Sequence, residues 1–244
     1  MKKLIMKKLI LAAFALTTAA SVFAQGTVVF NIRLAANQVH VWGPSATNPT
    51  LSLIGLGSND LPAGTTPFSA YQMVMIGSSG VSGHYGAAAT YAQLIGINTP
   101  TAALAPESSL VPVGQTTTFR TGGALGQLVS ITDTLSGTPP IAADSSFASF
   151  EIVAWDNSSG NYPTWTQASV AVRNGSIIAA GHSAEFEVSA IGGLTPTPNL
   201  DDMSHLTSFN LIQGPEPSTL ALAGLGAAML MIARWRKQPD STRF

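Results

Sequence analysis

The chain has 244 residues, no cysteine, a formal net charge of −1, and only 9% charged residues against 45% hydrophobic ones. Without cysteine it can form no disulfide framework, no thiolate zinc site and no cysteine nucleophile. Residues 25–213 contain three arginines, no lysine and ten acidic residues, so their net charge is three minus ten, or −7. Such an acidic segment offers no basic patch to phosphate backbones, which argues against nucleic-acid binding.

Residues 1–24 have the organisation of a secretory signal peptide. Lysines open the chain, Leu9–Ala20 is almost wholly apolar, and compact residues precede a cut predicted after Ala24. An N-terminal membrane anchor is the alternative, but spans normally need about 20 apolar residues and this run is shorter. The pentapeptide MKKLI occurs twice, so Met6 is a second candidate start.

The middle of the chain, residues 25–213, is rich in Gly, Ser, Thr, Ala and Pro and lacks long stretches of helical period. We therefore predict an all-β domain, a single antiparallel β-sandwich or jelly-roll-like fold. Its expected strands are Thr27–Leu34, Ser69–Gly77, Gln115–Arg120, Phe147–Trp155, Gln167–Val172, Ala184–Ile191 and Ser208–Ile212.

Alternation assigns faces to two of these segments. In Phe147–Trp155, one face is expected to carry Phe150, Ile152 and Ala154, and the other Ser149, Glu151 and Val153. In Ala184–Ile191, the glutamates are expected to point outward and Phe186 and Val188 inward. The segment Tyr85–Gly96 is expected to form either a short helix or a strand. The segment Ile97–Gly114 contains three prolines and is expected to form a long loop.

The C-terminal residues 214–244 begin with an extended Gly-Pro-Glu-Pro linker. Leu220–Ala233 then runs for fourteen residues without a charge, which gives a helix of about 21 Å against a hydrocarbon core of about 30 Å. Trp235 and the basic residues that follow still favour a transmembrane helix, with snorkelling and local thinning covering the mismatch. A helix packed in the protein core is the alternative.

Pro215–Lys237 resembles the PEP-CTERM sorting signal of bacteria, a Pro-Glu-Pro triplet followed by a short apolar helix and an Arg-rich end. The resemblance implies recognition by an exosortase, a membrane-embedded cysteine protease or transpeptidase. It also implies export toward extracellular polysaccharide or biofilm matrix. The residues that it implicates are the sorting motif Pro215, Glu216 and Pro217, and the membrane-retention cluster Arg234, Arg236 and Lys237.

Two segments have some features of a metal site, but neither supports a metal prediction. Asp201–His205 could place two carboxylates and an imidazole on one turn, but a solvated loop is the simpler interpretation. Asp156–Asn161 has the oxygen-bearing side chains of a calcium loop but lacks the closing bidentate glutamate, so a plain hairpin turn is favoured. We predict no metal and no cofactor.

No catalytic residue is predicted either. A glycosidase needs two carboxylates about 5–10 Å apart, and Glu185 and Glu187 are better explained as solubilising charges. For sugar stacking the best candidates are Trp155, Tyr162 and Trp165, although a Trp that closes an apolar strand more often belongs to the core.

Together these features favour an exported, non-enzymatic protein of the cell surface or extracellular matrix. It would be anchored in the inner membrane by its C-terminal helix until an exosortase processes it. The alternative is a carbohydrate-binding module associated with exopolysaccharide. A secreted hydrolase is less favoured, and a pocket that encloses two carboxylates, or a Ser–His contact, would revive that interpretation.

Overall fold

The computed structural model describes residues 25–33, 39–56, 61–62, 67–78, 84–177, 179–200, 206–214 and 229. Strands dominate this part of the chain, and almost all of them pair antiparallel, which confirms the all-β prediction. The predicted signal peptide (1–24) lies outside the described residues. So does the C-terminal segment 215–244, apart from Met229.

The largest sheet is built around two ten-residue strands, β5 (Thr90–Thr99) and β8 (Phe147–Asp156). They pair antiparallel along their whole length, from Thr90 opposite Asp156 to Thr99 opposite Phe147. The order in this sheet is β12-β9-β8-β5-β6, with β10 also pairing β8. The shorter strands are β6 (Val111–Pro112), β9 (Ala179–His182), β10 (Phe186–Ser189) and β12 (Ile212–Gln213).

Two smaller sheets complete the described fold, so the strands form three sheets rather than the two of a simple sandwich. In one sheet β1 (Thr27–Phe30) pairs antiparallel with β7 (Ile131–Thr134). The order of the other is β2-β11-β3-β4, and its β11–β2 pair is parallel. Its strands are β2 (Val41–Trp42), β3 (Ile54–Leu56), β4 (Leu61–Pro62) and β11 (Ser208–Asn210).

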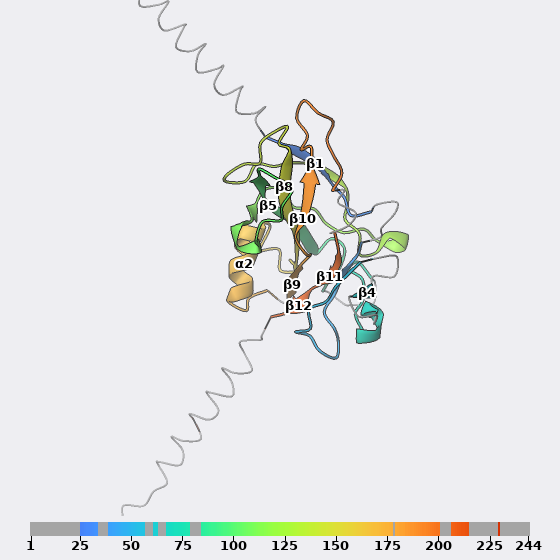
Figure 1. Ribbon diagram of the computed structural model, residues 1–244. Coiled ribbons are helices and arrows are strands. Elements are labelled where there is room, and N and C mark those ends of the chain that lie inside the picture. The colour runs from blue at the N-terminus through green and yellow to red at the C-terminus, as the bar shows by residue number, and fades with distance from the viewer. Residues whose placement is uncertain are drawn as a thin grey trace, which may run out of the picture.

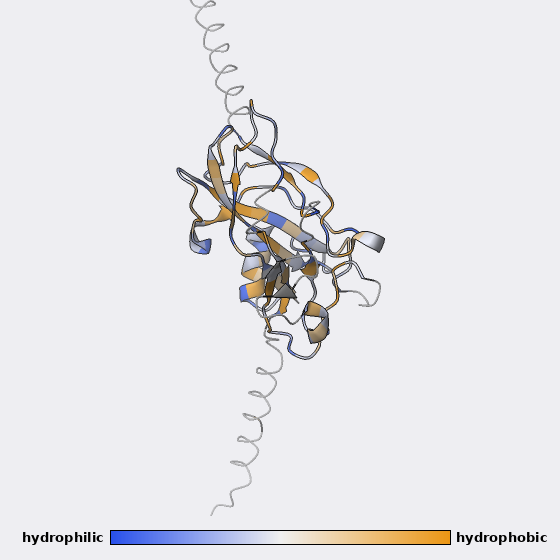
Figure 2. Cartoon of the chain, turned by 45° about the vertical axis from the view of Figure 1, so that its right-hand side comes forward, coloured by the Kyte–Doolittle hydropathy of each residue, from blue (hydrophilic) through white to orange (hydrophobic). Residues whose placement is uncertain are grey.

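The main hydrophobic core draws side chains from all three sheets. Phe30 of β1, Phe150 and Ile152 of β8 and Phe209 of β11 are buried in it. Gly96 lies opposite Phe150, and a Cβ there would meet the Phe150 ring at 2.6 Å, so glycine is needed for this ring to pack across the β5–β8 pair. Figure 2 shows the long strands coloured largely as apolar.

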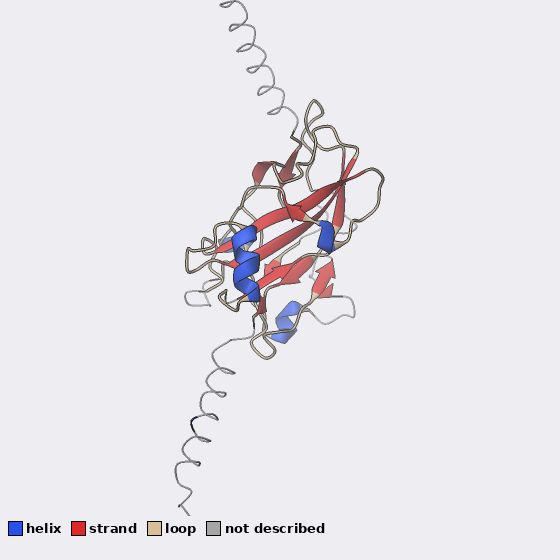
Figure 3. Ribbon diagram, turned by 90° about the vertical axis from the view of Figure 1, so that its left-hand side faces the viewer, coloured by secondary structure: helices blue, strands red, loops and turns tan. Residues whose placement is uncertain are grey.

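A second, smaller core covers the opposite face of the large sheet. The helix α2 (Trp165–Arg173) lies across the strands there, as Figure 3 shows from the side. Its buried Ala168 and Ala171 are three residues apart, and they belong to the same apolar cluster as Val153 and Trp155 of β8. Both faces of β8 are therefore covered, and Figure 1 shows α2 on the side of the domain away from β4.

Several expected strands take another form. Gln167–Val172 lies within α2, so the strand prediction there was wrong. Ser69–Gly77 begins with the 3-10 helix η1 (Phe68–Tyr71) and forms only a single bridge at Met75. Gln115–Arg120 forms two isolated bridges. Tyr85–Gly96 ends in strand β5 and contains no helix.

The long loop expected over Ile97–Gly114 is shorter than predicted, because β5 continues to Thr99. Within the loop lie the 3-10 helix η2 (Glu107–Ser109) and the short strand β6. A third 3-10 helix, η3 (Gly122–Ala124), follows it in the chain. Pairing of β6 with β5 returns this loop to the edge of the large sheet, beside the face that α2 covers.

Candidate functional site

A buried carboxylate lies on the α2 side of β8. Glu151 alternates with the core residues Phe150 and Ile152, so its side chain points to the opposite face, as the strand pattern predicts. Its side chain is nevertheless only 1% exposed, so this face of the strand is not in contact with solvent. Burial raises the pKa of the Glu151 carboxyl because water no longer stabilises its charge, and the contact with His182 partly opposes this effect.

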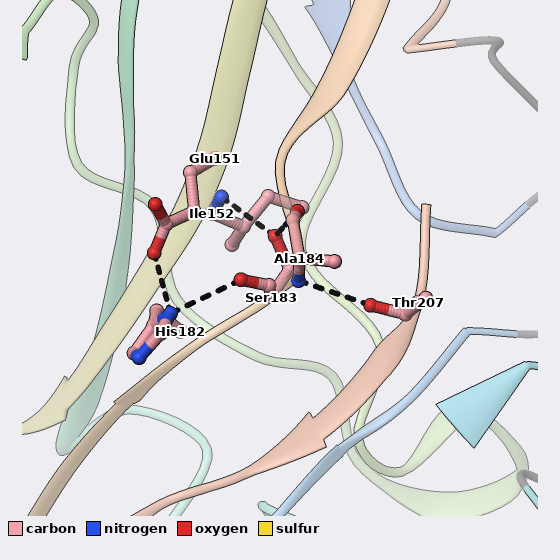
Figure 4. Close-up of polar contacts among 6 residues, drawn as sticks. All are labelled: Glu151, Ile152, His182, Ser183, Ala184 and Thr207. Atoms are coloured by element: carbon pink, nitrogen blue, oxygen red, sulfur yellow. Dashed lines mark hydrogen bonds and ion pairs between the residues drawn. The ribbon is translucent and has the colours of Figure 1, made fainter. Parts of the chain in front are cut away.

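The partner of Glu151 is the last residue of the neighbouring strand β9. His182 lies opposite Val153, and its Nδ1 is 2.7 Å from Glu151 Oε1 and 3.1 Å from the carbonyl oxygen of Ser183. Both neighbours of Nδ1 are acceptors, so Nδ1 carries a proton (Figure 4). The carboxylate raises the pKa of the His182 imidazole to about 9, so the ring is charged at neutral pH.

The end of β9 is held in place by Ser183. Its Oγ accepts a hydrogen bond from the Ile152 amide at 3.0 Å and donates one to the Ala184 carbonyl at 2.7 Å. The Ser183 amide donates to the Ile152 carbonyl at 2.9 Å, and the Ala184 amide donates to Thr207 Oγ1 at 3.1 Å. Figure 4 shows the contacts of Ser183 Oγ and of the Ala184 amide beside His182, and together with the bond from the Ser183 amide they fix the position of this end of β9.

A third ionisable side chain comes from the loop between β5 and β6. Glu107 begins η2, and the nearby Ala105 amide donates to Ser149 Oγ of β8 at 3.0 Å, which ties the loop to the sheet. One ligand atom each from Glu107, Glu151 and His182 lie within 4.8 Å of one another. Three segments far apart in the sequence therefore meet at one point.

These residues line a pocket of about 350 Å³ between the sheet and α2. The helix contributes Trp165, Ser169 and Arg173, which are spaced so that they share the side of α2 facing the pocket. The Trp165 amide at the start of α2 donates to Gln93 Oε1 of β5 at 2.7 Å. Two carboxylates, an imidazole, a guanidinium and an indole thus border one cavity.

The three aromatic candidates for sugar stacking occupy different environments. Trp155 is fully buried, and its Nε1 donates to the Tyr162 carbonyl at 2.9 Å, so its ring belongs to the core and presents no face to a ligand. Its ring centroid is 5.7 Å from that of Trp165. Trp165 and Tyr162 are half-buried, and of the three only Trp165 borders the pocket.

The segment Asp156–Asn161 forms a turn, although the element that follows is α2 rather than a hairpin strand. Two of its side-chain oxygens accept local amides: the Ser158 amide donates to Asp156 Oδ1, and the Tyr162 amide donates to Asn157 Oδ1. His84 Nδ1 lies 3.2 Å from Asp156 Oδ2 and 3.3 Å from Ser158 Oγ, which is an exposed Ser–His contact. The Gly160 amide donates to the Asn157 carbonyl at 2.8 Å, and Gly160 has a φ of 72°, which favours glycine.

Three other groups of residues singled out from the sequence lie outside the described residues. They are the acidic segment Asp201–His205, the triplet Pro215, Glu216 and Pro217, and the cluster Arg234, Arg236 and Lys237. Within the described residues no helix combines the length and apolar character needed to cross a membrane.

Comparison with protein families assigns the C-terminal segment. The model of the PEP-CTERM protein-sorting motif matches residues 215–237. The chain carries a PEP-CTERM sorting motif. This match covers the residues on which the sequence resemblance was based, and it identifies an exported protein that an exosortase targets. Comparisons with curated proteins and with solved structures gave no match.

The PEP-CTERM motif describes sorting and does not extend to the pocket, whose residues the sequence did not reveal. The available signal was Glu151, a single charge inside an otherwise apolar strand. Such a charge either faces solvent or has a buried partner. Its neighbours Glu107 and His182 lie 44 and 31 residues away in the chain (151 minus 107, and 182 minus 151), so no spacing rule connects them.

Proposed function

We propose that this protein is a non-catalytic component of the cell surface or extracellular matrix, delivered there by exosortase processing. The observation that carries this proposal is the PEP-CTERM motif at residues 215–237. The acidic, lysine-free composition of residues 25–213 supports a role outside the cytoplasm as cargo, since it offers no surface for nucleic acid. The β-rich domain is the part that would remain after processing.

Before processing, Leu220–Ala233 would anchor the chain in the inner membrane, and Arg234, Arg236 and Lys237 would stay on the cytoplasmic side. Replacing Glu216 by Ala tests this proposal. Export should continue while removal of the tail stops, so that full-length protein accumulates in the membrane fraction on immunoblots. Deleting Leu220–Lys237 should instead release the β-rich domain to the medium. Normal processing of the Glu216 variant would overturn the assigned role of the triplet.

The non-catalytic part of the proposal has its own test, because the pocket encloses two carboxylates. Glycoside hydrolysis uses two carboxylates that flank one site, so two carboxylates at one pocket call for this test. Purified wild-type protein should release no reducing sugar from exopolysaccharide of the producing cells. Release that disappears in the Glu151→Gln variant would overturn the proposal and identify a hydrolase.

Carbohydrate binding is the second candidate, favoured by the position of Trp165. Its half-buried indole borders the pocket beside charged and hydroxyl side chains, a combination that stacks on and hydrogen-bonds to sugar rings. Retention on immobilised exopolysaccharide should fall at least about tenfold in Trp165→Ala. The control is Leu194→Ala, which removes a side chain that is 99% exposed and does not line the pocket.

A further inference from the structure

The Glu107, Glu151 and His182 side chains converge in a way that neither sorting nor sugar stacking explains. We propose that these three residues bind one divalent transition-metal ion of the zinc class at the wall of the pocket. The proposal concerns the β-rich domain alone and is independent of how the C-terminal segment is processed.

The first argument is geometric. Three atoms no more than 4.8 Å apart all lie within about 2.8 Å of a common centre, since 4.8/√3 is the circumradius of the widest such triangle. Zinc binds imidazole nitrogen and carboxylate oxygen at about 2.0–2.2 Å. Side-chain movements of less than about 1 Å would therefore complete the coordination.

The second argument is the state of Glu151 itself. Its side chain is 1% exposed and lines the pocket, and Oε2 has no hydrogen-bond partner among the described residues. Among the described residues, the partner of Oε1 is the imidazole of His182. Buried carboxylate oxygens are normally satisfied because an unpaired one is costly. A cation at this point would satisfy Oε2 and explain why a charge is kept inside the sheet–helix interface.

The donor set identifies the class of ion. Calcium takes six to eight oxygen ligands, and magnesium keeps most of its waters, so an imidazole with two carboxylates suits neither. Imidazole and carboxylate together are typical zinc ligands, and zinc binding would release to solvent the proton that makes the His182 ring cationic. Three protein ligands leave a fourth tetrahedral position open, and in this structure it would face the pocket bordered by Ser169 and Arg173.

Zinc titration by calorimetry tests the proposal on the full chain, purified in mild detergent without a histidine tag and stripped with EDTA. A tag must be avoided because its own imidazoles bind zinc. We expect one zinc ion per chain. Glu107→Gln, Glu151→Gln and His182→Asn should each weaken binding at least about tenfold. Glu187→Gln, which removes a carboxylate that does not line the pocket, should leave it unchanged.

Two further measurements test whether the three proposed residues are the zinc ligands. Glu107 is exposed on η2, so its variant should fold normally and report on binding alone. Arg173→Ala should retain zinc, whereas loss of zinc in that variant would overturn the assigned ligand set. In long-range ¹H–¹⁵N spectra, zinc should shift a ring nitrogen of His182. Absence of binding below 1 mM zinc, equal binding by all variants, or binding of calcium in preference to zinc would each overturn the proposal.

Discussion

The imidazole of His182 forms an ion pair with the buried carboxylate of Glu151, with 2.7 Å between Nδ1 and Oε1. This contact joins the end of β9 to the middle of β8 at the wall of the pocket. One partner is almost completely buried and the other is 46% exposed, so the pair connects the sheet–helix interface to solvent.

This pair predicts lower stability at alkaline pH. The pKa of His182 is raised from 6.5 to about 9, so the native state holds its proton more tightly than the unfolded chain. The stabilisation is complete below pH 6.5 and is lost as the pH rises through about 9. Because the imidazole is partly exposed, we expect a loss on the order of 1 kcal/mol after allowance for solvent screening.

Urea unfolding in EDTA at pH 6 and pH 9.5 measures the effect of this ion pair. The unfolding free energy of the wild type should fall between these pH values. The unfolding free energy of His182→Asn should change much less, because asparagine has no proton to lose over this range. A wild-type free energy that stays constant or rises over this range would contradict the prediction.

Asp133 predicts a second pH dependence, in the acidic range. Its side chain is fully buried on β7, its Oδ1 accepts the Gln115 amide at 2.8 Å, and Oδ2 has no partner among the described residues. Burial raises the pKa of Asp133 from 3.8 to about 6, and two backbone amides oppose this effect. The native state therefore holds the proton more tightly, and its advantage disappears as the pH rises from about 3.8 to about 6.

Replacing Asp133 by Asn should remove this dependence. The amide keeps an acceptor for Gln115 but carries no charge at any pH. The stability of Asp133→Asn relative to wild type should increase by up to about 3 kcal/mol between pH 4 and pH 7. Guanidinium unfolding at both pH values gives this difference directly, and a difference that is the same at both would show that Asp133 does not titrate in the native range.

The two tryptophans that meet across β8 and α2 should differ strongly in their contributions to stability. Trp155 is fully buried and donates a hydrogen bond to Tyr162, whereas Trp165 is half-buried at the pocket. Trp155→Ala should lower the unfolding free energy by about 3–5 kcal/mol, and Trp165→Ala by less than half as much. Denaturant titration of both variants measures these changes. Equal losses of unfolding free energy would contradict the prediction that the two rings differ in burial.

Gly181 lies in β9 directly before His182, where the strand passes β11. A Cβ at this position would meet the carbonyl oxygen of Asn210 at 2.2 Å. Gly181→Ala should therefore destabilise the protein by about 1–3 kcal/mol and displace His182. Gly123→Ala is the matched control, because a Cβ there has nothing within 4 Å. Chemical denaturation of both variants distinguishes this contact from a general effect of replacing glycine.

Alternation was the reliable signal in this sequence. It predicted the two faces of Phe147–Trp155 and the inward Phe186 and Val188, because a strand between two environments must alternate. The same signal failed for Gln167–Val172. Two small alanines three residues apart fit a helix against Trp155 equally well, and only the tertiary contact decides between the two.

The pocket was beyond sequence reasoning for a different reason. The sequence correctly predicts that Glu151 lies on the face opposite Phe150, but whether that face is solvated depends on α2, part of which was predicted as a strand. Glu107 lies in a loop that only its return to the edge of β5 brings near the sheet. Convergence of this kind follows from topology, which local patterns do not specify.

The position of β12 has a mechanical consequence. Its two residues pair with Ala179 and Ala180 of β9, and Gly214 is the last described residue before the sorting segment. Any tension applied through the tail enters the fold at this short ladder and is passed to the strand that ends in His182. A pulling force on the C-terminal segment would therefore act first on the strand that carries His182 at the wall of the pocket.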